Sequence, residues 1–386
     1  MVPLRIGIVA AEPSGDLLAA GLMDALREQL PAVQFEGVAG PLMRNSGIDE
    51  WEPMDSLSVM GLFEVLQHLP RLLRLRSRLL KRWRNTPPLA FIGVDAPDFN
   101  LTLERRLREL GIPTVHYVSP TVWAWRAGRV KNIRRAVDLL LTIFPFETEF
   151  LAQHRVPAHY VGHPLAHDMP MQPDRDGSRD VLGLDADAPV LALLPGSRSG
   201  EVSRITRPFL ETALALKQYL PELQVVVPLV NERTRMLFDE QMRLAAPELN
   251  PMVVLQQTRA ALAAADVVLV ASGTATLEGL LSKRPMVVGY KANSATYGLV
   301  QLLGLVKVKH VAMANLLADE RLAPELIQDA CEPAQLLPPL LEFFRDAGLR
   351  ARIAQRYAEI HRRLRTDTNR EAADAVLHLL RARGLV

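Results

Sequence analysis

Val190-Leu-Ala-Leu-Leu-Pro-Gly-Ser-Arg-Ser-Gly-Glu201 places five apolar residues directly before a turn of glycine, serine and arginine. An apolar run of this length is typical of a strand that is covered on both faces of a parallel sheet. The sequence predicts a helix that starts near Ser203, so the order is strand, polar turn and helix. This order is the repeating unit of α/β proteins.

Short apolar runs like this one recur along the chain and alternate with amphipathic stretches. They predict strands over Leu4–Ala10, Gln34–Val38, Leu89–Gly93, Thr114–Val118, Leu139–Ile143, Ala158–Val161, Val190–Leu194, Gln224–Val227, Met252–Leu255, Val267–Ala271 and Met286–Gly289. A Pro- and Asp-rich passage separates the first six runs from the last five. Two such series predict an α/β protein with two doubly wound, Rossmann-like domains that face each other across a cleft.

This division gives four parts. We expect a first domain over residues 1–165, a linker over 166–188, a second domain over 189–337 and a helical segment over 338–386. The last segment is Arg-rich and has no predicted strand. Because it has no sheet of its own to join, we expect it to pack back on the first domain or on a partner subunit.

The net charge of the 386 residues is only +2, but this charge is unevenly distributed. Residues 71–135 carry a net charge of +11, which leaves −9 for the rest of the chain. An asymmetry of this size indicates an anionic partner. The single cysteine, Cys331, excludes an intramolecular disulfide and fits a reducing compartment. No apolar run approaches the roughly 18 residues that span a bilayer, so we expect a cytoplasmic protein whose membrane contact is peripheral.

Two polar turns in the second domain predict a nucleotide site. Small residues that let a phosphate approach the backbone stand at both turns: Gly196, Ser197, Ser272, Gly273 and Thr274. Arg198 adds a planar charge that can neutralise a diphosphate without a metal ion. Glu278, one helical turn beyond Thr274, can accept hydrogen bonds from a ribose diol. The structural alternatives are a turn arginine with no ligand and a glutamate on a solvated helix face.

Two turns in the first domain predict a second ligand site. Gly93-Val-Asp-Ala-Pro-Asp-Phe-Asn100 puts the side chains of Asp95, Asp98 and Asn100 at the carboxyl end of a strand, where open α/β sheets bind ligands. Either carboxylate can act as a general base for a hydroxyl nucleophile or cap the following helix. In Ala11-Glu-Pro-Ser-Gly-Asp16, Ser14 and Gly15 open a helix whose N-terminus favours an anion, and the alternative is an ordinary capped turn.

The sequence gives little indication of a metal site. His163 and His167 are four residues apart, but Pro164 lies between them and argues against a shared helix face. Asp185-Ala-Asp187 spells a DxD pattern, which holds a divalent ion on nucleotide sugars elsewhere, but it precedes a strand within the linker. We interpret it as a solvated loop, and we expect neither a metal ion nor a cofactor.

Residues 71–84 predict a cationic amphipathic helix, with seven Lys and Arg residues and no acid. Such a helix lies in a membrane interface, where each cation near an anionic surface contributes about 1 kcal/mol. Together with the apolar stretch before it, the candidate docking residues are Leu62, Phe63, Leu66, Leu69, Leu72, Leu73, Arg74, Leu75, Arg78, Leu79, Leu80, Lys81, Arg82 and Trp83. The alternative is a helix that packs on its own sheet. A nucleic-acid site fits less well, because few aromatic residues alternate with the cations.

Several motifs, in order over most of the chain, are similar to those of the lipid-A-disaccharide synthases, a family of glycosyltransferases with the two-domain GT-B fold. Besides Ala11–Asp16 and Gly93–Asn100, these motifs are Tyr117-Val-Ser-Pro-Thr-Val-Trp-Ala-Trp125, Val161-Gly-His-Pro164, Leu194-Pro-Gly-Ser-Arg198, Ser272-Gly-Thr-Ala-Thr-Leu-Glu278, Pro285-Met-Val-Val-Gly-Tyr290 and Asn315-Leu-Leu317.

The resemblance implies an inverting glycosyltransferase that needs no metal ion. Such an enzyme transfers 2,3-diacylglucosamine from UDP-2,3-diacylglucosamine to the 6-hydroxyl of 2,3-diacylglucosamine 1-phosphate (lipid X). The products are lipid A disaccharide 1-phosphate and UDP. The second domain would bind UDP, with Arg198 on the diphosphate and Asn315 added to the site. The first domain would bind the acceptor, with Asp98 as general base and Ser14 and Gly15 beside the reaction centre.

The resemblance also implies where the protein acts. Because both substrates are acylated, it would dock on the anionic phospholipid of the inner membrane's cytoplasmic face. It would form a homodimer through its C-terminal segment and bind no nucleic acid. The alternatives are another UDP-GlcNAc-type GT-B transferase, an epimerase, or a membrane-associated nucleotide-binding module without catalysis. An epimerase would need no lipid-docking helix, so residues 71–84 argue against it.

Overall fold

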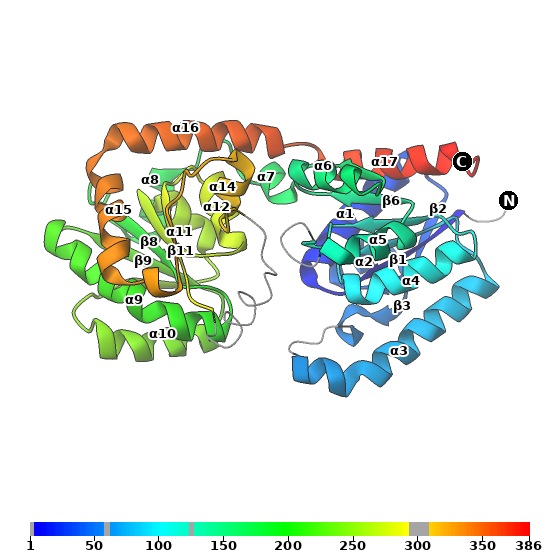
Figure 1. Ribbon diagram of the computed structural model, residues 1–386, viewed down its shortest axis with the longest axis horizontal. Coiled ribbons are helices and arrows are strands. Elements are labelled where there is room, and N and C mark those ends of the chain that lie inside the picture. The colour runs from blue at the N-terminus through cyan, green and yellow to red at the C-terminus, as the bar shows by residue number, and fades with distance from the viewer. Residues whose placement is uncertain (1–3, 58–61, 123–126, 293–308) are drawn as a thin grey trace. The chain divides into compact units, whose positions relative to one another are not determined.

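The computed structural model describes residues 4–57, 62–122, 127–292 and 309–386 (Figure 1). Side chains of residues 62–68 and Ala127 are outside this description, as are Trp123 and Trp125 of the aromatic motif. The chain forms two compact units. Unit 1 contains Met1–His167 and Leu364–Val386, and unit 2 contains Asp168–Arg363. The prediction of two doubly wound α/β domains is confirmed by the topology of their sheets.

Unit 1 contains a parallel seven-stranded sheet in the order β3-β2-β1-β4-β5-β6-β7. Its strands are β1 (Leu4–Ala10), β2 (Val33–Ala39), β3 (Asp49–Pro53), β4 (Ala90–Val94), β5 (Thr114–Tyr117), β6 (Leu139–Thr142) and β7 (Ala158–Tyr160). The chain first builds outward from β1 to β3 and then returns to the other side of β1 with β4. Strand order therefore reverses between β1 and β4, which is where open α/β sheets bind ligands.

Helices cover both faces of this sheet (Figure 1). They are α1 (Pro13–Gln29), α2 (Pro41–Asn45), α3 (Leu62–Asn85), α4 (Pro97–Glu109), α5 (Val130–Ala136), α6 (Pro145–Gln153), α7 (Pro164–Asp168) and α17 (Thr368–Ala382), with short 3₁₀ helices η1 (Met54–Ser56) and η2 (Ala127–Arg129). Side chains of β4 alternate between the two faces, as the period of a strand requires. Ile92 packs in the core formed with α1 and α17, whereas Phe91 packs in the core formed with α3 and α4.

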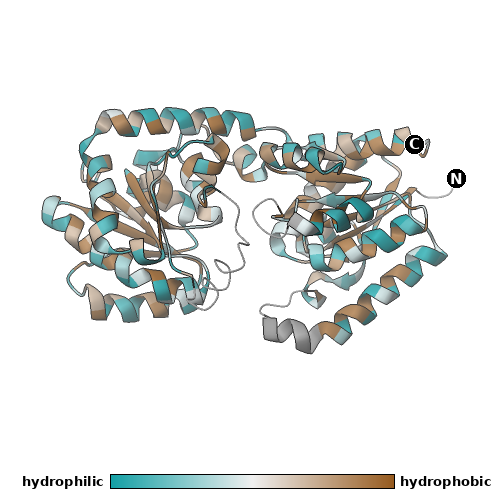
Figure 2. Ribbon diagram, viewed as in Figure 1, coloured by the Kyte–Doolittle hydropathy of each residue, from teal (hydrophilic) through white to brown (hydrophobic). Residues whose placement is uncertain are grey.

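Unit 2 has the same architecture, with the sheet order β10-β9-β8-β11-β12-β13 and a reversal between β8 and β11. Its strands are β8 (Val190–Leu194), β9 (Gln224–Leu229), β10 (Met252–Leu255), β11 (Val267–Ala271), β12 (Met286–Tyr290) and β13 (Glu325–Ile327). Its helices are α8 (Arg175–Leu182), α9 (Ser199–Tyr219), α10 (Glu232–Ala245), α11 (Thr258–Ala264), α12 (Thr274–Leu281), α14 (Met313–Ala318), α15 (Pro333–Arg345) and α16 (Ala347–Leu364), with η3 (Gln328–Ala330). The strands of both sheets are predominantly hydrophobic (Figure 2).

The C-terminal helices divide between the two units. Helices α15 and α16 belong to unit 2, whereas α17 packs back on α1 in unit 1. Val376 and Leu380 of α17 are fully buried in the same core cluster as Ile8 of β1. The Arg383 guanidinium, just after α17, donates to the Asp138 carboxylate at 2.7 Å. We expected all of residues 338–386 to pack on the first domain or on a partner, but only α17 contributes to the core of the first domain, whereas α15 and α16 belong to unit 2.

Candidate functional site

In unit 2, the two predicted phosphate-binding turns form one pocket of about 280 Å³. The turns follow β8 and β11, the two strands between which the strand order reverses. The lining includes the expected residues Gly196, Ser197, Arg198, Ser272, Gly273, Thr274 and Glu278. Seven of the eight residues predicted to bind UDP therefore lie around a single space.

The turn after β8 is held by Glu201, which the sequence analysis did not identify. Its carboxylate accepts hydrogen bonds from the backbone N–H groups of Ser197 and Arg198, both at 3.3 Å. It also pairs with the Arg198 guanidinium at 3.1 Å. The Arg198 side chain is 83% exposed, so it is free to turn toward a ligand. A sequence signal for this role of Glu201 does exist. A glutamate at the third helical position after the N-cap is one half of a capping box, which predicts hydrogen bonds to the backbone of the turn.

Gly196 at this turn has a φ of +116°, a backbone conformation that L side chains rarely adopt. A Cβ atom on residue 196 would lie 2.7 Å from the Cβ of Glu201. Glycine is therefore required both by the turn and by the contact with the capping glutamate.

The turn after β11 leads directly into α12, whose N-cap is Gly273. Gly273, Thr274 and Ala275 line the pocket, so the N-terminus of α12 borders it. The partial positive charge of a helix N-terminus stabilises an anion at this position. The Ser272 hydroxyl donates to the Val311 carbonyl at 3.3 Å, which links the turn to the segment before α14.

Glu278 lines the same pocket from α12 and is half-buried. Burial raises the pKa of its carboxyl group, and the nearby charge of Arg259 lowers it in part. A partly desolvated carboxylate at the wall of a nucleotide-sized pocket suits an acceptor of hydrogen bonds from a diol.

Asn315, the eighth residue predicted to bind UDP, does not line the pocket, and its side chain is fully buried. Its amide nitrogen donates to the Ala323 carbonyl at 2.7 Å and to Glu325 at 3.0 Å. Its amide oxygen accepts from the N–H groups of Leu322 and Ala323, both at 2.8 Å. All of the amide's hydrogen-bonding capacity is thus used within the protein, which corrects the expectation of a ligand contact.

The position of Asn315 nevertheless matters for the pocket. Glu325 also accepts hydrogen bonds from the backbone N–H groups of Val311 and Ala312, at 3.0 and 2.7 Å. Val311 is in turn the residue whose carbonyl accepts the Ser272 hydroxyl. Asn315 therefore supports the pocket indirectly, through Glu325 and residue 311.

In unit 1, the turns after β1 and β4 lie in contact at the reversal of strand order. A Cβ on Gly15 would lie 3.6 Å from the Val94 carbonyl oxygen. Helix α1 begins at Pro13 with Glu12 as N-cap, so Ser14 is exposed in the first turn. Asp95 and Ala96 both adopt the left-handed region, with φ values of +52° and +43°. Ala96, not either aspartate, is the N-cap of α4.

Asn100 stabilises this left-handed turn through two hydrogen bonds to its backbone. Its side chain is fully buried, and its amide nitrogen donates to the carbonyls of Val94 at 3.3 Å and Asp95 at 2.8 Å. Asn100 was predicted to line the ligand site, but its burial makes it a positioning residue for Asp95. Asn100 is buried and Asp98 is exposed because Asn100 faces the sheet, whereas Asp98 faces away from it.

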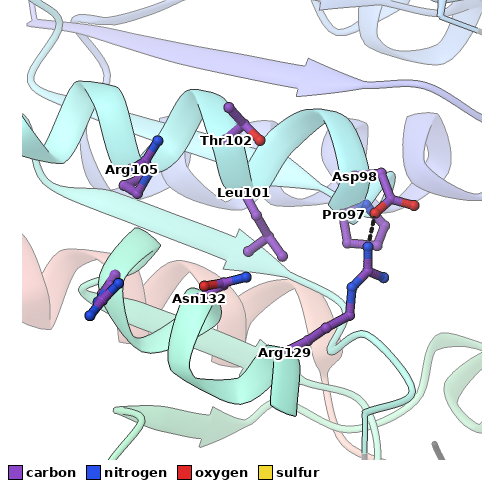
Figure 3. A pocket seen from close by; sticks show the side chains of 8 residues that line it. Pro97, Asp98, Leu101, Thr102, Arg105, Arg129 and Asn132 are labelled. Carbon is purple, nitrogen blue, oxygen red and sulfur yellow. Dashed lines mark hydrogen bonds and ion pairs between the residues drawn. The ribbon is translucent and has the colours of Figure 1, made fainter. Parts of the chain in front are cut away.

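Asp98 lies in the first turn of α4 with its side chain 79% exposed, and it pairs with the Arg129 guanidinium from η2 (Figure 3). Both residues line a pocket of about 360 Å³ between α4 and α5. Asp98 was predicted from its motif, whereas no motif pointed to Arg129. Asp98 and Arg129 are 31 positions apart, and only the fold brings them together.

The predicted membrane helix is α3, and most of its described apolar face is core. Leu75, Leu79 and Trp83 are buried against the sheet, and the Trp83 indole N–H donates to Glu36 at 3.0 Å. These three side chains are unavailable to a membrane, which corrects their assignment as docking residues. Leu72 and Leu80 are partly buried against the same cluster.

Other docking candidates on α3 are exposed. Leu69 and Leu73 are 42% and 43% exposed, and the hydrophilic residues around them are visible along the helix (Figure 2). The four candidate cations, Arg74, Arg78, Lys81 and Arg82, are also exposed; Arg78 pairs with Glu52 at 2.7 Å, and Arg82 stacks on Trp51 at 3.5 Å from its ring centroid. Leu62, Phe63 and Leu66 lie in α3, but their side chains are outside the described residues.

Among the described residues, no three His, Cys, Asp or Glu side chains gather in a way that could hold a metal ion. In the DxD pattern, the Asp185 carboxylate accepts hydrogen bonds from the backbone N–H groups of Asp187 at 2.8 Å and Ala188 at 3.3 Å. The pattern is therefore a tight turn. Nor does the described part of the chain contain a helix with the length and apolar character that crossing a bilayer requires.

Comparison with known proteins agrees with the motifs. A model of the lipid-A-disaccharide synthetase family matches residues 6–378. A lipid-A-disaccharide synthase of Xanthomonas euvesicatoria pv. vesicatoria is 49% identical over 382 residues, which cover 99% of this chain and 87% of that protein. The synthase of Escherichia coli O1:K1 / APEC is 46% identical over 377 residues, 98% of each chain.

Solved structures with low sequence identity share the fold. A UDP-GlcNAc 2-epimerase from Neisseria meningitidis, bound to UDP-GlcNAc, aligns with a TM-score of 0.60 at 10% identity, covering 97% of this chain and 99% of that one. The spinosyn rhamnosyltransferase SpnG aligns with a TM-score of 0.56 at 14% identity, covering 98% and 99%. Transferases and epimerases share this two-domain α/β fold, so the fold alone does not distinguish their activities.

Proposed function

The chain belongs to the lipid-A-disaccharide synthetase family, and on this premise we propose how its residues divide the reaction. It is a UDP-sugar glycosyltransferase that forms the lipid A disaccharide. The observation that carries the assignment of residues is the pocket of unit 2, where two glycine-rich turns, an arginine and a partly buried glutamate meet.

UDP-2,3-diacylglucosamine binds in this pocket. The Arg198 guanidinium leaves Glu201, or shares its charge with it, and neutralises the diphosphate. The backbone at Gly196, Ser197, Gly273 and the N-terminus of α12 contacts the phosphate oxygens. Glu278 accepts hydrogen bonds from the ribose hydroxyls. Arg198 and the helix N-terminus together stabilise the negative charge that develops on the leaving UDP.

The acceptor, 2,3-diacylglucosamine 1-phosphate, binds to unit 1 beside Asp98, with Ser14, Gly15 and Asp95 bordering the reacting groups. Asp98 takes the proton of the acceptor's 6-hydroxyl as that oxygen forms a bond to C1 of the donor sugar. The bond from C1 to the diphosphate oxygen breaks, and its electron pair leaves with UDP. Attack from the side opposite the leaving group inverts the configuration at C1. Arg129 orients the Asp98 carboxylate before the acceptor arrives.

Turnover of the two lipid substrates tests this proposal. The wild-type protein, incubated with UDP-2,3-diacylglucosamine and lipid X, should release UDP and form a disaccharide phosphate. Asp98→Asn should lower kcat at least about a hundredfold, the typical contribution of a general base, and keep its affinity for UDP. Glu109→Gln, an exposed carboxylate at the other end of α4, is the matched control and should turn over normally. Substantial turnover by Asp98→Asn would remove Asp98 from its role.

The same incubation distinguishes the alternatives. A nucleotide-binding module without catalysis would bind UDP and yield no disaccharide. An epimerase would convert the UDP-sugar without consuming lipid X, and another transferase of this fold would leave lipid X unused.

Membrane association and dimerisation complete the proposal. The exposed surface of α3, with Leu69, Leu73 and the cations Arg74, Arg78 and Lys81, docks peripherally on the anionic cytoplasmic face of the inner membrane. Docking there gives access to two acylated substrates. Because α17 follows a short connection after α16, two copies can exchange it and make the same contacts with α1 of the partner, which supports a homodimer.

A further inference from the structure

The pocket between α4 and α5 extends well beyond Asp98. On α4, Asp98, Leu101, Thr102 and Arg105 are spaced three, four and seven residues apart, so they share one face of the helix. Arg129 and Asn132 face them from η2 and α5 (Figure 3), and Arg135 of α5 also lines the pocket. Residues 98 and 105 are about 10 Å apart along the helix axis, from the rise of 1.5 Å per residue. The space is therefore a groove with Asp98 and Arg129 at one end and Arg105 and Arg135 at the other.

The far end of this groove carries positive charge that the protein does not neutralise strongly. Within the described residues, the ion-pair partner of Arg105 is Glu109 of its own helix, at 3.7 Å, and both side chains are about half exposed. Exposed ion pairs of this kind contribute little to protein stability. Arg135 has no acidic partner within ion-pair distance in the part of the chain that the structure describes. Of the described residues that line the groove, Asp98 alone is acidic.

A separate contact sets the width of the groove. Arg108, three residues after Arg105 and outside the lining, donates to the Asp138 carboxylate and to the Arg134 carbonyl, both at 2.9 Å. These bonds tie the C-terminal end of α4 to the end of α5. Arg105 and Arg135 thus belong to two helices that these hydrogen bonds hold together. The two helices therefore need little rearrangement when an anion binds between them.

We propose that Arg105 and Arg135, together with Thr102 and Asn132, bind the phosphate monoester of the acceptor sugar. The inference rests on the proposed role of Asp98, because it orients the acceptor relative to that residue. In lipid X the ring oxygen joins C1, which carries the phosphate, to C5, which carries the hydroxymethyl group, so both groups extend from the same edge of the ring. In the proposed orientation this edge runs along the groove, with the phosphate between the two arginines and the 6-hydroxyl on the side of Asp98.

The remaining lining residues suit the same ligand. A guanidinium binds phosphate oxygens through two parallel hydrogen bonds, and the Thr102 hydroxyl and Asn132 amide can donate to the others. Leu101 offers an apolar surface between the two ends of the groove. The volume of about 360 Å³ lies within the range of small-molecule sites and accommodates a sugar phosphate, with the acyl chains left outside. The groove thereby selects a phosphorylated acceptor over the same sugar without phosphate.

Steady-state kinetics with two acceptors tests the proposal. Arg105→Ala/Arg135→Ala should raise KM for lipid X at least about tenfold and leave KM for UDP-2,3-diacylglucosamine unchanged, since lost hydrogen bonds to a charged group have this effect. Wild type should prefer lipid X strongly over 2,3-diacylglucosamine without phosphate, and the double variant should lose most of this preference. Arg106→Ala, an exposed arginine of α4 outside the groove, is the matched control.

Each other outcome has a definite meaning. If wild type forms disaccharide and the double variant keeps the preference for the phosphorylated acceptor, the phosphate site is elsewhere and only this inference fails. If wild type forms no disaccharide, the proposed function itself fails. Binding to vesicles of anionic phospholipid should be unchanged in the double variant. A loss of vesicle binding with an unchanged KM would instead assign the groove to a membrane phosphate and overturn the inference. Arg105→Lys/Arg135→Lys, which keeps both charges, should recover part of the preference and thereby exclude misfolding.

Discussion

Oε1 of Glu104 lies 2.6 Å from Nδ1 of His116, and neither side chain has any exposed surface. The pair joins the inner face of α4 to β5, directly beneath the turn that carries Asp98. Gly93 of β4 lacks a side chain at this point, and Glu104 occupies the space that a Cβ would need. Burial raises the pKa of Glu104, and His116 lowers it in part.

Glu104→Ala should destabilise unit 1 by roughly 3–5 kcal/mol, because it leaves His116 buried without its partner and opens a cavity beneath α4. Denaturant unfolding followed by circular dichroism measures this change. Glu109→Ala, an exposed residue of the same helix, should change the free energy of unfolding by no more than about 0.5 kcal/mol. Equal effects of the two substitutions would mean that the buried pair contributes nothing to stability.

His163 should make the stability of unit 1 depend on pH. Burial lowers its pKa from 6.5 to about 4. Between these values the unfolded chain binds a proton that the folded protein excludes, so stability is lost as the pH falls from 6.5 toward 4. The full loss is about 3 kcal/mol. His163→Asn should flatten this part of the curve of unfolding free energy against pH; a curve with the wild-type slope would contradict the assignment.

Gly196→Ala should lower the affinity for UDP about tenfold or more, because alanine is strained at this φ and its Cβ displaces Glu201 from the turn. Isothermal titration calorimetry with UDP measures the loss. Gly200→Ala is the control, since a Cβ there meets only the end of the flexible Arg204 side chain, at 3.3 Å. Wild-type affinity in Gly196→Ala would show that the turn does not contact the nucleotide.

Substitutions along α3 should separate membrane docking from folding. Leu69→Ser/Leu73→Ser alters exposed side chains, so it should weaken sedimentation with anionic vesicles and change stability little. Leu79→Ser alters a core side chain and should cost roughly 2–5 kcal/mol of stability. If the double variant still sediments with vesicles like wild type, the docking surface does not include this part of α3.

Apolar patterning predicted the strands of both sheets except one edge strand of each, β3 and β13, and it did predict the other two edge strands, β7 and β10. β3 (Asp49–Pro53) has the sequence Asp-Glu-Trp-Glu-Pro, and β13 (Glu325–Ile327) has only three residues. Edge strands of this kind are short and partly exposed, so they need no apolar run. Periodicity also located the apolar stripe of α3, but it does not reveal whether a stripe meets a bilayer or the protein's own sheet, because both are apolar.

Motifs predicted most of the residues around the pocket of unit 2, because turns after neighbouring parallel strands meet at one edge of a sheet. The motifs did not predict whether a side chain points into a pocket or into the protein core. Asn100 and Asn315 lie within motifs, yet both amide nitrogens are buried and donate within the protein, that of Asn100 to the Val94 and Asp95 carbonyls and that of Asn315 to the Ala323 carbonyl and Glu325. The groove between α4 and α5 was not predicted, because it depends on how two helices pack rather than on a pattern within either of them.

The return of α17 to unit 1 has a consequence for biosynthesis. Helix α1 packs against residues near the very end of the chain, so the hydrophobic surface that receives Val376 and Leu380 stays uncovered on the nascent polypeptide while the whole of unit 2 is translated. Unit 2, by contrast, is one uninterrupted stretch and can fold as soon as it has left the ribosome. Unit 1 is therefore begun before unit 2 but completed after it, and a polypeptide that stops before α17 would carry a complete unit 2 attached to an incomplete unit 1.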